Sequence, residues 1–375
     1  MIRFRERLSL TALLTLVLVL VGGLFLSLVG IDALEGRSDF QFFADSGTYH
    51  AAARGELPGI DGLGDSIGVT GNFLGPLLIL ELAGQNYYAV LVLNALLYFA
   101  AVAGIARSLK LDPLRFTFLL LLNPLTVSSL LSVNKEIVSL VFLALAIRGF
   151  VTRSFPLLIA AGLVAILVRW QLTVFLVTMV MLAAPVNPLR SERAKTVMAL
   201  LVGLSVLYVQ LAAVFEPIWF TFEQSAAEYE GSGLYEWIQG WQEVGAYALI
   251  FPLKAAHLLF GLGLRFDRLF APVDWYNDGW QLLHSTMTLV LFLALWRTRR
   301  LSLNNDLVYI SIVYLAVFAI SPIYSPRYFY PVYVIWAAAL SMGSSRARLL
   351  TPPNSEKKRR LPRPNVHHPQ VADAL

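Results

Sequence analysis

The chain of 375 residues is 57% hydrophobic and only 14% charged, which is more apolar than a soluble domain. It carries a net charge of +5 and no cysteine, so disulfides, thiolate catalysis and cysteine-ligated metals are excluded. Nucleic acid is not an expected partner, because most of the positive charge flanks apolar runs, where lipid headgroups attract Lys and Arg. The composition therefore predicts an all-α, polytopic membrane protein.

Apolar runs of spanning or near-spanning length predict about ten transmembrane helices in one domain, residues 1–343. Helices are the expected spanning elements, because backbone polar groups cannot stay unpaired in hydrocarbon. The expected spans are 8–30, 87–109, 114–132, 136–150, 155–168, 171–185, 196–215, 279–296, 306–321 and 327–343. The first is too long for a signal peptide, and we interpret it as a retained span.

Positive charge alternates between the two sides of these spans and predicts their orientation. With both tails cytoplasmic, every short basic loop lies on the cytoplasmic side, as the positive-inside rule requires. These loops contain Arg107, Lys110 and Arg115; Arg148 and Arg153; Arg190, Arg193 and Lys195; and Arg297, Arg299 and Arg300. The basic tail, 344–375, is predicted to be disordered.

Two further apolar stretches, 73–83 and 246–264, would break this alternation if they crossed the bilayer. We expect them to form re-entrant or interfacial helices on the outer face, within two large outer loops, 31–86 and 216–278. Asn123-Pro124, inside the third span, predicts a kink, because proline removes a backbone donor and clashes with the preceding turn.

The first outer loop supplies a candidate general base. If the segment after the first span is helical, Asp45 and Tyr49 share one face. A carboxylate at a membrane boundary is suited to take a proton from an acceptor hydroxyl. Asp39 is the competing candidate, and the alternative for Asp45 is a helix cap or a solvated loop charge.

Two polar strings interrupt apolar segments at the same outer surface. Lys135 and Glu136 are adjacent opposite charges beside hydrocarbon, where each is costly unless paired. Lys135 is a candidate phosphate ligand, and the alternative is simple capping by Asn134 with Glu136 at the helix dipole. In the second string, Arg169 offers a fork that matches phosphate oxygens and Trp170 can flank a lipid or sugar. The alternative for Arg169 is interfacial snorkelling.

A third cation precedes the last span. The string Pro326-Arg327-Tyr328 lies between prolines that predict a rigid turn presenting the guanidinium. No pair of histidines has ligand spacing beside a carboxylate and no P-loop is present, so neither a metal site nor ATP hydrolysis is predicted. No cofactor is expected, although dependence on a divalent metal stays open.

These pieces resemble the GT-C superfamily of integral-membrane glycosyltransferases, which includes lipid-A aminoarabinose transferases and protein O-mannosyltransferases. The resemblance rests on Asp39 and Asp45-Ser46-x-x-Tyr49 in the first outer loop and on Pro326-Arg327-Tyr328-x-x-Pro331 before the final span. It implies Asp45 or Asp39 as the base and Arg327 as a contact for the phosphate of a polyprenyl-phosphate sugar. This chain has no clear second acidic partner close to Asp45, which leaves metal dependence and acceptor class open.

We therefore predict a multi-pass glycosyltransferase of the inner (plasma) membrane. It would move a sugar from a lipid-linked donor to a hydroxyl of a glycan or lipid acceptor at the periplasmic face. The expected substrate contacts are Tyr49, Lys135, Glu136, Arg169, Trp170, Arg327 and Tyr328. The cations Lys135, Arg169 and Arg327 would stabilise the departing phosphate. An O-antigen-type polysaccharide polymerase is the nearest alternative, and a basic outer loop would favour it, whereas both large outer loops here are acidic.

Two further alternatives belong to other classes. A transporter or flippase of lipid-linked oligosaccharides would use Lys135, Glu136 and Arg169 as sites at the middle of the bilayer. A scaffold subunit of an envelope complex would need none of these side chains for chemistry.

Overall fold

The computed structural model describes residues 2–30, 44–56, 73–189, 191–210, 233–261, 279–321 and 325–342. The helices are α1 (Ile2–Val29), α3 (Ala44–Ala53), α5 (Leu74–Leu82), α6 (Tyr87–Leu109), α7 (Pro113–Leu121), α8 (Pro124–Leu131), α9 (Lys135–Thr152), α10 (Phe155–Ile166), α11 (Trp170–Ala183), α12 (Arg193–Gln210), α14 (Gly233–Glu243), α15 (Tyr247–Phe260), α16 (Gln281–Arg297), α17 (Asp306–Phe318), the 3-10 helix η3 (Pro326–Phe329) and α18 (Tyr330–Ser341). Among these residues every regular element is a helix, which confirms the all-α prediction. Residues 31–43, 57–72, 211–232, 262–278 and 343–375 lie outside the described residues. They include much of the two expected outer loops, the end of the expected span 196–215 and the basic tail.

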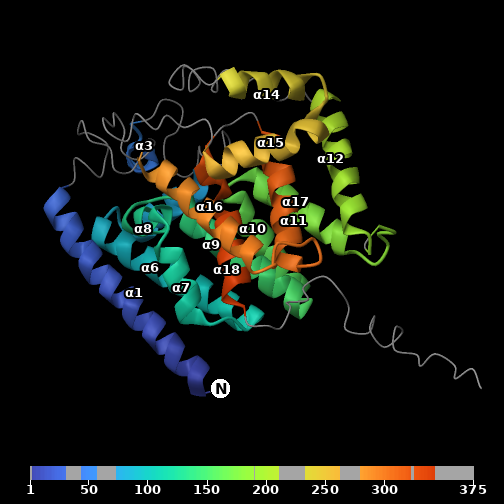
Figure 1. The fold of residues 1–375 in the computed structure, drawn as a ribbon. Coiled ribbons are helices and arrows are strands. Elements are labelled where there is room, and N and C mark those ends of the chain that lie inside the picture. Colours follow the sequence, from blue (N-terminus) through green and yellow to red (C-terminus); the bar gives the residue numbers. More distant parts are fainter. Residues whose placement is uncertain are drawn as a thin grey trace, which may run out of the picture.

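The helices form a bundle with α18 near its centre and α1 along one edge (Figure 1). All twelve residues of α18 are buried, whereas α1 exposes a row of leucines, among them Leu16, Leu20 and Leu28. A broad apolar outer surface of this kind is costly in water and suits hydrocarbon.

Three described helices are long and apolar enough to cross a membrane, namely α1 from Phe4 onward, α6 and α12. The bent pair α7 and α8 adds a fourth if it counts as one span. Helices α10, α11, α15 and α17 are apolar but shorter, with 10–17 residues each. The apolar helices expected of a membrane protein are therefore present, while the total of about ten crossings stays a prediction.

The expected kink at Asn123-Pro124 is a complete break. Helices α7 and α8 meet at 86°, and the side chain of Asn123 accepts a hydrogen bond from the Leu125 backbone N–H at 3.0 Å. Proline is well tolerated at the start of a helix, because the N–H that it lacks would have no partner there. Asn123 and Pro124 therefore begin a new helix, and the chain changes direction inside the bundle.

The apolar run 154–184 forms two helices, α10 and α11, as predicted, with a break at 167–169. Gly75 of α5 packs against this break. Its backbone N–H donates to the Leu167 carbonyl at 2.7 Å, and a Cβ at this position would lie 2.7 Å from the same oxygen. The close approach of two backbones here requires glycine.

Gly75→Ala is therefore expected to destabilise the protein by about 1–3 kcal/mol, because the methyl group must push the two backbones apart. Gly23→Ala in α1 is the matched control, since no atom lies within 4 Å of its Cβ position. The control is expected to be neutral or stabilising by about 0.5–1 kcal/mol, because alanine favours the helix. Thermal unfolding of both variants in one detergent checks this, and equal melting temperatures would contradict the packing argument.

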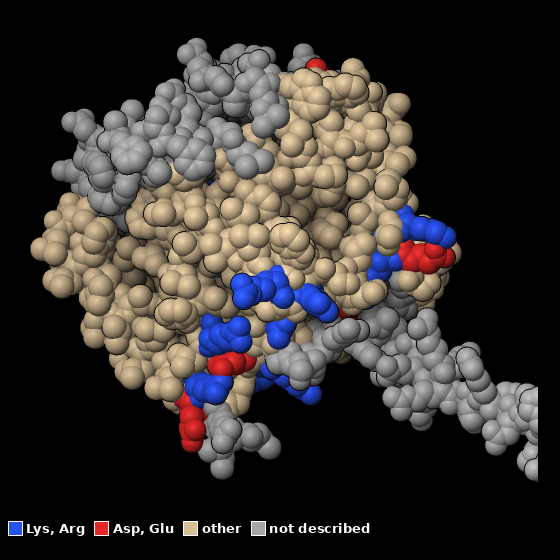
Figure 2. All heavy atoms as spheres, in the orientation of Figure 1, with Lys and Arg blue, Asp and Glu red and all other residues tan. Residues whose placement is uncertain are grey.

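The basic loops meet at one end of the bundle. Arg7 at the start of α1 pairs with Asp112 between α6 and α7, and Arg193 at the start of α12 pairs with Asp306 at the start of α17. Arg300, after α16, donates to three carbonyls at the end of α18. Figure 2 shows Lys and Arg side chains, with a few Asp and Glu among them, on the lower part of the visible face and in a second group at its right edge. The alternation of charge thus identifies loops that share one end, while the cytoplasmic placement of that end stays a prediction.

Candidate functional site

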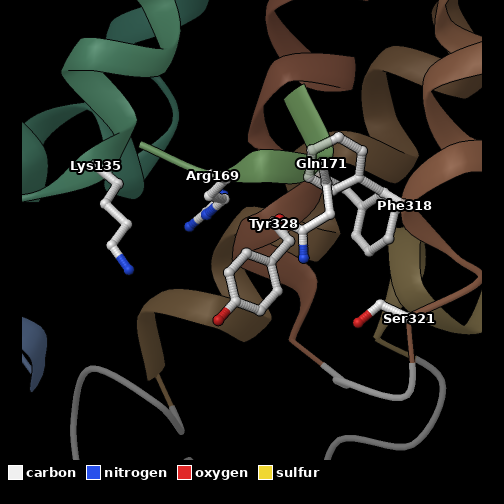
Figure 3. A pocket seen from close by; sticks show the side chains of 7 residues that line it. Lys135, Arg169, Gln171, Phe318, Ser321 and Tyr328 are labelled. Carbon is white, nitrogen blue, oxygen red and sulfur yellow. The ribbon is translucent and has the colours of Figure 1, made fainter. Parts of the chain in front are cut away.

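A small pocket lies at the other end of these helices, where α17 ends and where α9 and α11 begin. The short helix η3 completes its wall. The side chains that line it are Lys135, Arg169, Gln171, Phe318, Ser321, Tyr328 and Phe329. In Figure 3, Lys135 and Arg169 lie on one side of Tyr328, and Gln171, Phe318 and Ser321 lie on the other.

Arg169 is held inside the protein by two contacts. Its guanidinium donates to Glu136 Oε1 at 3.2 Å and lies 4.1 Å from the centre of the Tyr328 ring. Arg169 is 4% exposed and Glu136 is 1% exposed, so the pair is removed from solvent. This burial argues against the snorkelling alternative for Arg169, because a snorkelling side chain would extend its guanidinium away from the protein.

The buried pair of Arg169 and Glu136 does not use all of its hydrogen-bonding groups. Glu136 Oε2 and Arg169 Nε have no hydrogen-bond partner among the described residues. A single hydrogen bond between two buried charges repays only part of their desolvation, and a guanidinium can donate five. Arg169 therefore retains capacity for an anion that enters the pocket.

The side chain of Lys135 contacts two aromatic rings, one in α3 and one just before α5. Its ammonium lies 5.6 Å from the ring centre of Tyr49 in α3 and 5.8 Å from that of Phe73 before α5. The predicted cap is present, because the Asn134 side chain accepts from the Lys135 backbone N–H at 2.7 Å. Capping does not account for the two charged side chains, however, since Glu136 pairs with Arg169 and the side chain of Lys135 lines the pocket.

Arg327 adds a third cation beside the pocket, although it is not one of the residues that line it. It belongs to η3, the rigid turn expected from the flanking prolines, and its guanidinium lies 5.5 Å from the Tyr328 ring centre. Tyr328 therefore has one guanidinium at 4.1 Å and a second at 5.5 Å. Three cations and one carboxylate in the described part of the site favour a negatively charged ligand.

The starts of two helices also favour an anion in the pocket. Helices α9 and α11 both begin at the pocket, and a helix N-terminus carries a partial positive charge with unpaired N–H groups. Arg169 is itself the residue before α11 and provides no side-chain cap to it. The backbone thus adds to the positive potential that the three side chains create.

Some predicted residues lie elsewhere. Trp170 is 46% exposed and does not line the pocket, whereas its neighbour Gln171 does. Asp45 lies in α3, so its helical placement four residues before Tyr49 is confirmed, but its side chain is outside the described residues. Asp39 is outside them entirely. The described residues contain no group of three or more His, Asp or Glu side chains that could hold a metal ion.

Sequence reasoning missed Gln171, Phe318, Ser321 and Phe329 as pocket residues. The sequence contains a signal for Gln171, because it is the third residue of the polar string that begins at Arg169. Phe318 and Ser321 had no local signal, because an aromatic and a serine at the end of an apolar helix are ordinary.

Comparison with protein-family models, with curated proteins and with solved structures finds no match to this chain. The site must therefore be interpreted from its own residues. Its described members are a buried ion pair, two further cations and an aromatic ring, all at one end of a bundle of apolar helices.

Proposed function

We propose that this protein is an integral-membrane glycosyltransferase of the inner (plasma) membrane that uses a polyprenyl-phosphate sugar as donor. The observation that carries the proposal is that Lys135 and Arg169 line one pocket with Tyr328, whose ring also lies beside the guanidinium of Arg327. These residues come from three separate segments and converge at the end of the bundle opposite the basic loops. A phosphate on a membrane-bound chain is the ligand that fits both the charge and the apolar surroundings.

The reaction would be a displacement at the anomeric carbon of the donor sugar. The acceptor hydroxyl oxygen forms the new bond to this carbon, while the bond from the carbon to the phosphate oxygen breaks. The phosphate leaves with the electron pair, and Asp45 takes the proton of the acceptor, with Asp39 as the competing base. The cations would stabilise the charge that grows on the leaving phosphate.

The length of α9 favours this proposal over a transporter. Glu136 lies in the first turn of α9, and Arg169 lies in the break between α10 and α11. The starts of broken helices can bind substrate at the middle of the bilayer in a transporter, so the break alone does not separate the two functions. Helix α9, however, extends for 18 residues between the pocket and the basic end, about 27 Å, which is close to the hydrocarbon thickness and suits a site at one membrane surface.

The experiment that tests the proposal is sugar transfer by the purified protein in nanodiscs. A panel of radiolabelled polyprenyl-phosphate sugars is supplied with extracted envelope lipids and glycans as acceptors. We expect turnover by the wild type and its loss in folded Asp45→Asn. Glu192→Gln is the control, because this carboxylate lies in an exposed pair beside the basic loops. Turnover that survives in Asp45→Asn would refute the assignment of the base, and a wild type that turns over no donor would refute the transferase.

A further inference from the structure

Helix α16 has a polar face that the proposed chemistry does not use. Gln281, His284, Ser285 and Thr288 are all buried, and their spacing of three to four residues places them on one side of the helix. Buried polar side chains in an apolar helix are costly unless hydrogen-bonded. Their partners therefore indicate what this face does.

His284 connects the broken span to η3. Its Nδ1 lies 2.7 Å from Asn123 Nδ2, and its Nε2 lies 3.2 Å from the Pro326 carbonyl oxygen. Asn123 Oδ1 already accepts from Leu125 N, so the amide presents its NH₂ group to the ring. An amide NH₂ only donates and a carbonyl only accepts, so Nδ1 is the acceptor and Nε2–H donates to Pro326.

The residues around Arg327 are anchored in the same way. The hydroxyl of Tyr314 in α17 donates to the Tyr328 carbonyl at 2.8 Å, and Ser325 donates to Gln281 Oε1 at 3.2 Å. The carbonyls on both sides of Arg327 are therefore held by side chains from other helices. A 3-10 turn of four residues has few internal hydrogen bonds, so these anchors determine how it is held.

We propose that His284 and Asn123 are positioning residues that hold Pro326 and thereby keep Tyr328 in the wall of the cationic pocket and Arg327 beside it. This inference rests on the proposed function, because it assigns the two residues to the same phosphate site. The break between α7 and α8 contributes directly, since it places the Asn123 side chain against α16. Polar groups on a short turn need such support to keep the geometry that transfer requires.

The absence of cysteine makes the position of Arg327 measurable without an activity assay. The variant Gln171→Cys introduces a single thiol among the residues that line the pocket. The reactivity of this thiol toward charged reagents reports the electrostatic potential in the pocket. The measurement is the ratio of its labelling rates with anionic sulfonatoethyl and cationic trimethylammonioethyl methanethiosulfonate. We expect the anionic reagent to react faster, and farnesyl phosphate to slow labelling. Arg327→Gln in this background is expected to lower the ratio about threefold or more, because one unit charge leaves the neighbourhood of the thiol.

Two variants of His284 then separate positioning from simple packing. In His284→Gln the amide nitrogen replaces Nε2 and can still donate to Pro326. In His284→Asn the shorter amide can still meet Asn123 but cannot reach Pro326. We expect the ratio in His284→Asn to fall to the level of Arg327→Gln. The ratio in His284→Gln is expected to stay clearly above that level, because the donor to Pro326 remains although the contact with Asn123 is lost. Equal ratios in the two variants would overturn the proposal.

Asn123→Ser supplies a second measurement if His284→Asn does not fold. Serine retains the cap of α8 but cannot reach the His284 ring, so the labelling ratio is expected to fall again. A parental ratio in folded Asn123→Ser would overturn the role of Asn123. A ratio near one in the parent itself would instead refute the cationic pocket and the proposed function, so the two failures are distinguishable.

Discussion

Arg169→Met is expected to destabilise the protein by about 3–5 kcal/mol, because it leaves the buried carboxylate of Glu136 without its cation. The side chains of Arg169 and Glu136 are 5% and 1% exposed, so water cannot replace the lost partner. The loss of the guanidinium from the Tyr328 ring adds to the effect. Denaturant unfolding in mixed micelles measures the change in the free energy of unfolding.

The double variant Arg169→Met with Glu136→Leu distinguishes stability from function. Replacing both members of a buried pair by apolar side chains of similar volume removes both desolvation costs, so most of the lost stability is expected to return. Farnesyl phosphate is expected to bind to neither variant, because both lack the guanidinium of Arg169. A double variant as unstable as Arg169→Met would contradict the pairing.

The exposed pair of Lys195 and Glu192 provides the control for this series. Its side chains are 70% and 48% exposed. Glu192→Gln is therefore expected to change stability by less than about 1 kcal/mol, because solvent screens an exposed pair. A control effect as large as that of Arg169→Met would attribute the loss to charge in general and not to burial.

Arg327→Gln is expected to reduce turnover by about 10²–10³, the usual cost of removing one preorganised donor from a developing anion. Arg327 is only half-buried, so the free energy of unfolding of the Arg327→Gln variant is expected to stay close to that of the wild type. Single-turnover transfer from a polyprenyl-phosphate sugar measures the chemical step. Undiminished transfer in Arg327→Gln would remove this residue from the phosphate site.

Variants of Tyr328 provide the matched comparison for Arg327. Tyr328→Phe retains the ring face beside Arg169 and Arg327 and is expected to transfer sugar at nearly the wild-type rate. Tyr328→Leu removes the ring and is expected to slow transfer. Equal rates in the two variants would show that the ring does not hold the guanidinium groups in place.

Local rules identified the three cations in the described part of the site. Lys135, Arg169 and Arg327 stand out from the sequence because charged side chains inside or beside apolar runs are rare and costly. The cap at Asn134 and the start of α8 at Asn123 also follow from short-range hydrogen bonds. Such signals depend on neighbours within a few residues, so they can be interpreted without a fold.

Pairings between distant segments were not accessible in this way. Glu136 and Arg169 were each proposed as substrate contacts, and the structure makes them partners across 33 positions of the chain. His284 was one of five scattered histidines and carried no expectation. Its role depends on the 86° angle between α7 and α8, an angle that the residues at the break do not specify.

The amino-acid sequence by itself determined the helical class, the apolar runs and the basic loops that share one end, because hydrophobicity and charge act locally or through the membrane. Only the tertiary structure decided which polar side chains meet. Contacts between Arg169, Tyr328 and Glu136 depend on how α9, α11 and η3 pack, and packing is set by the shapes of many side chains together.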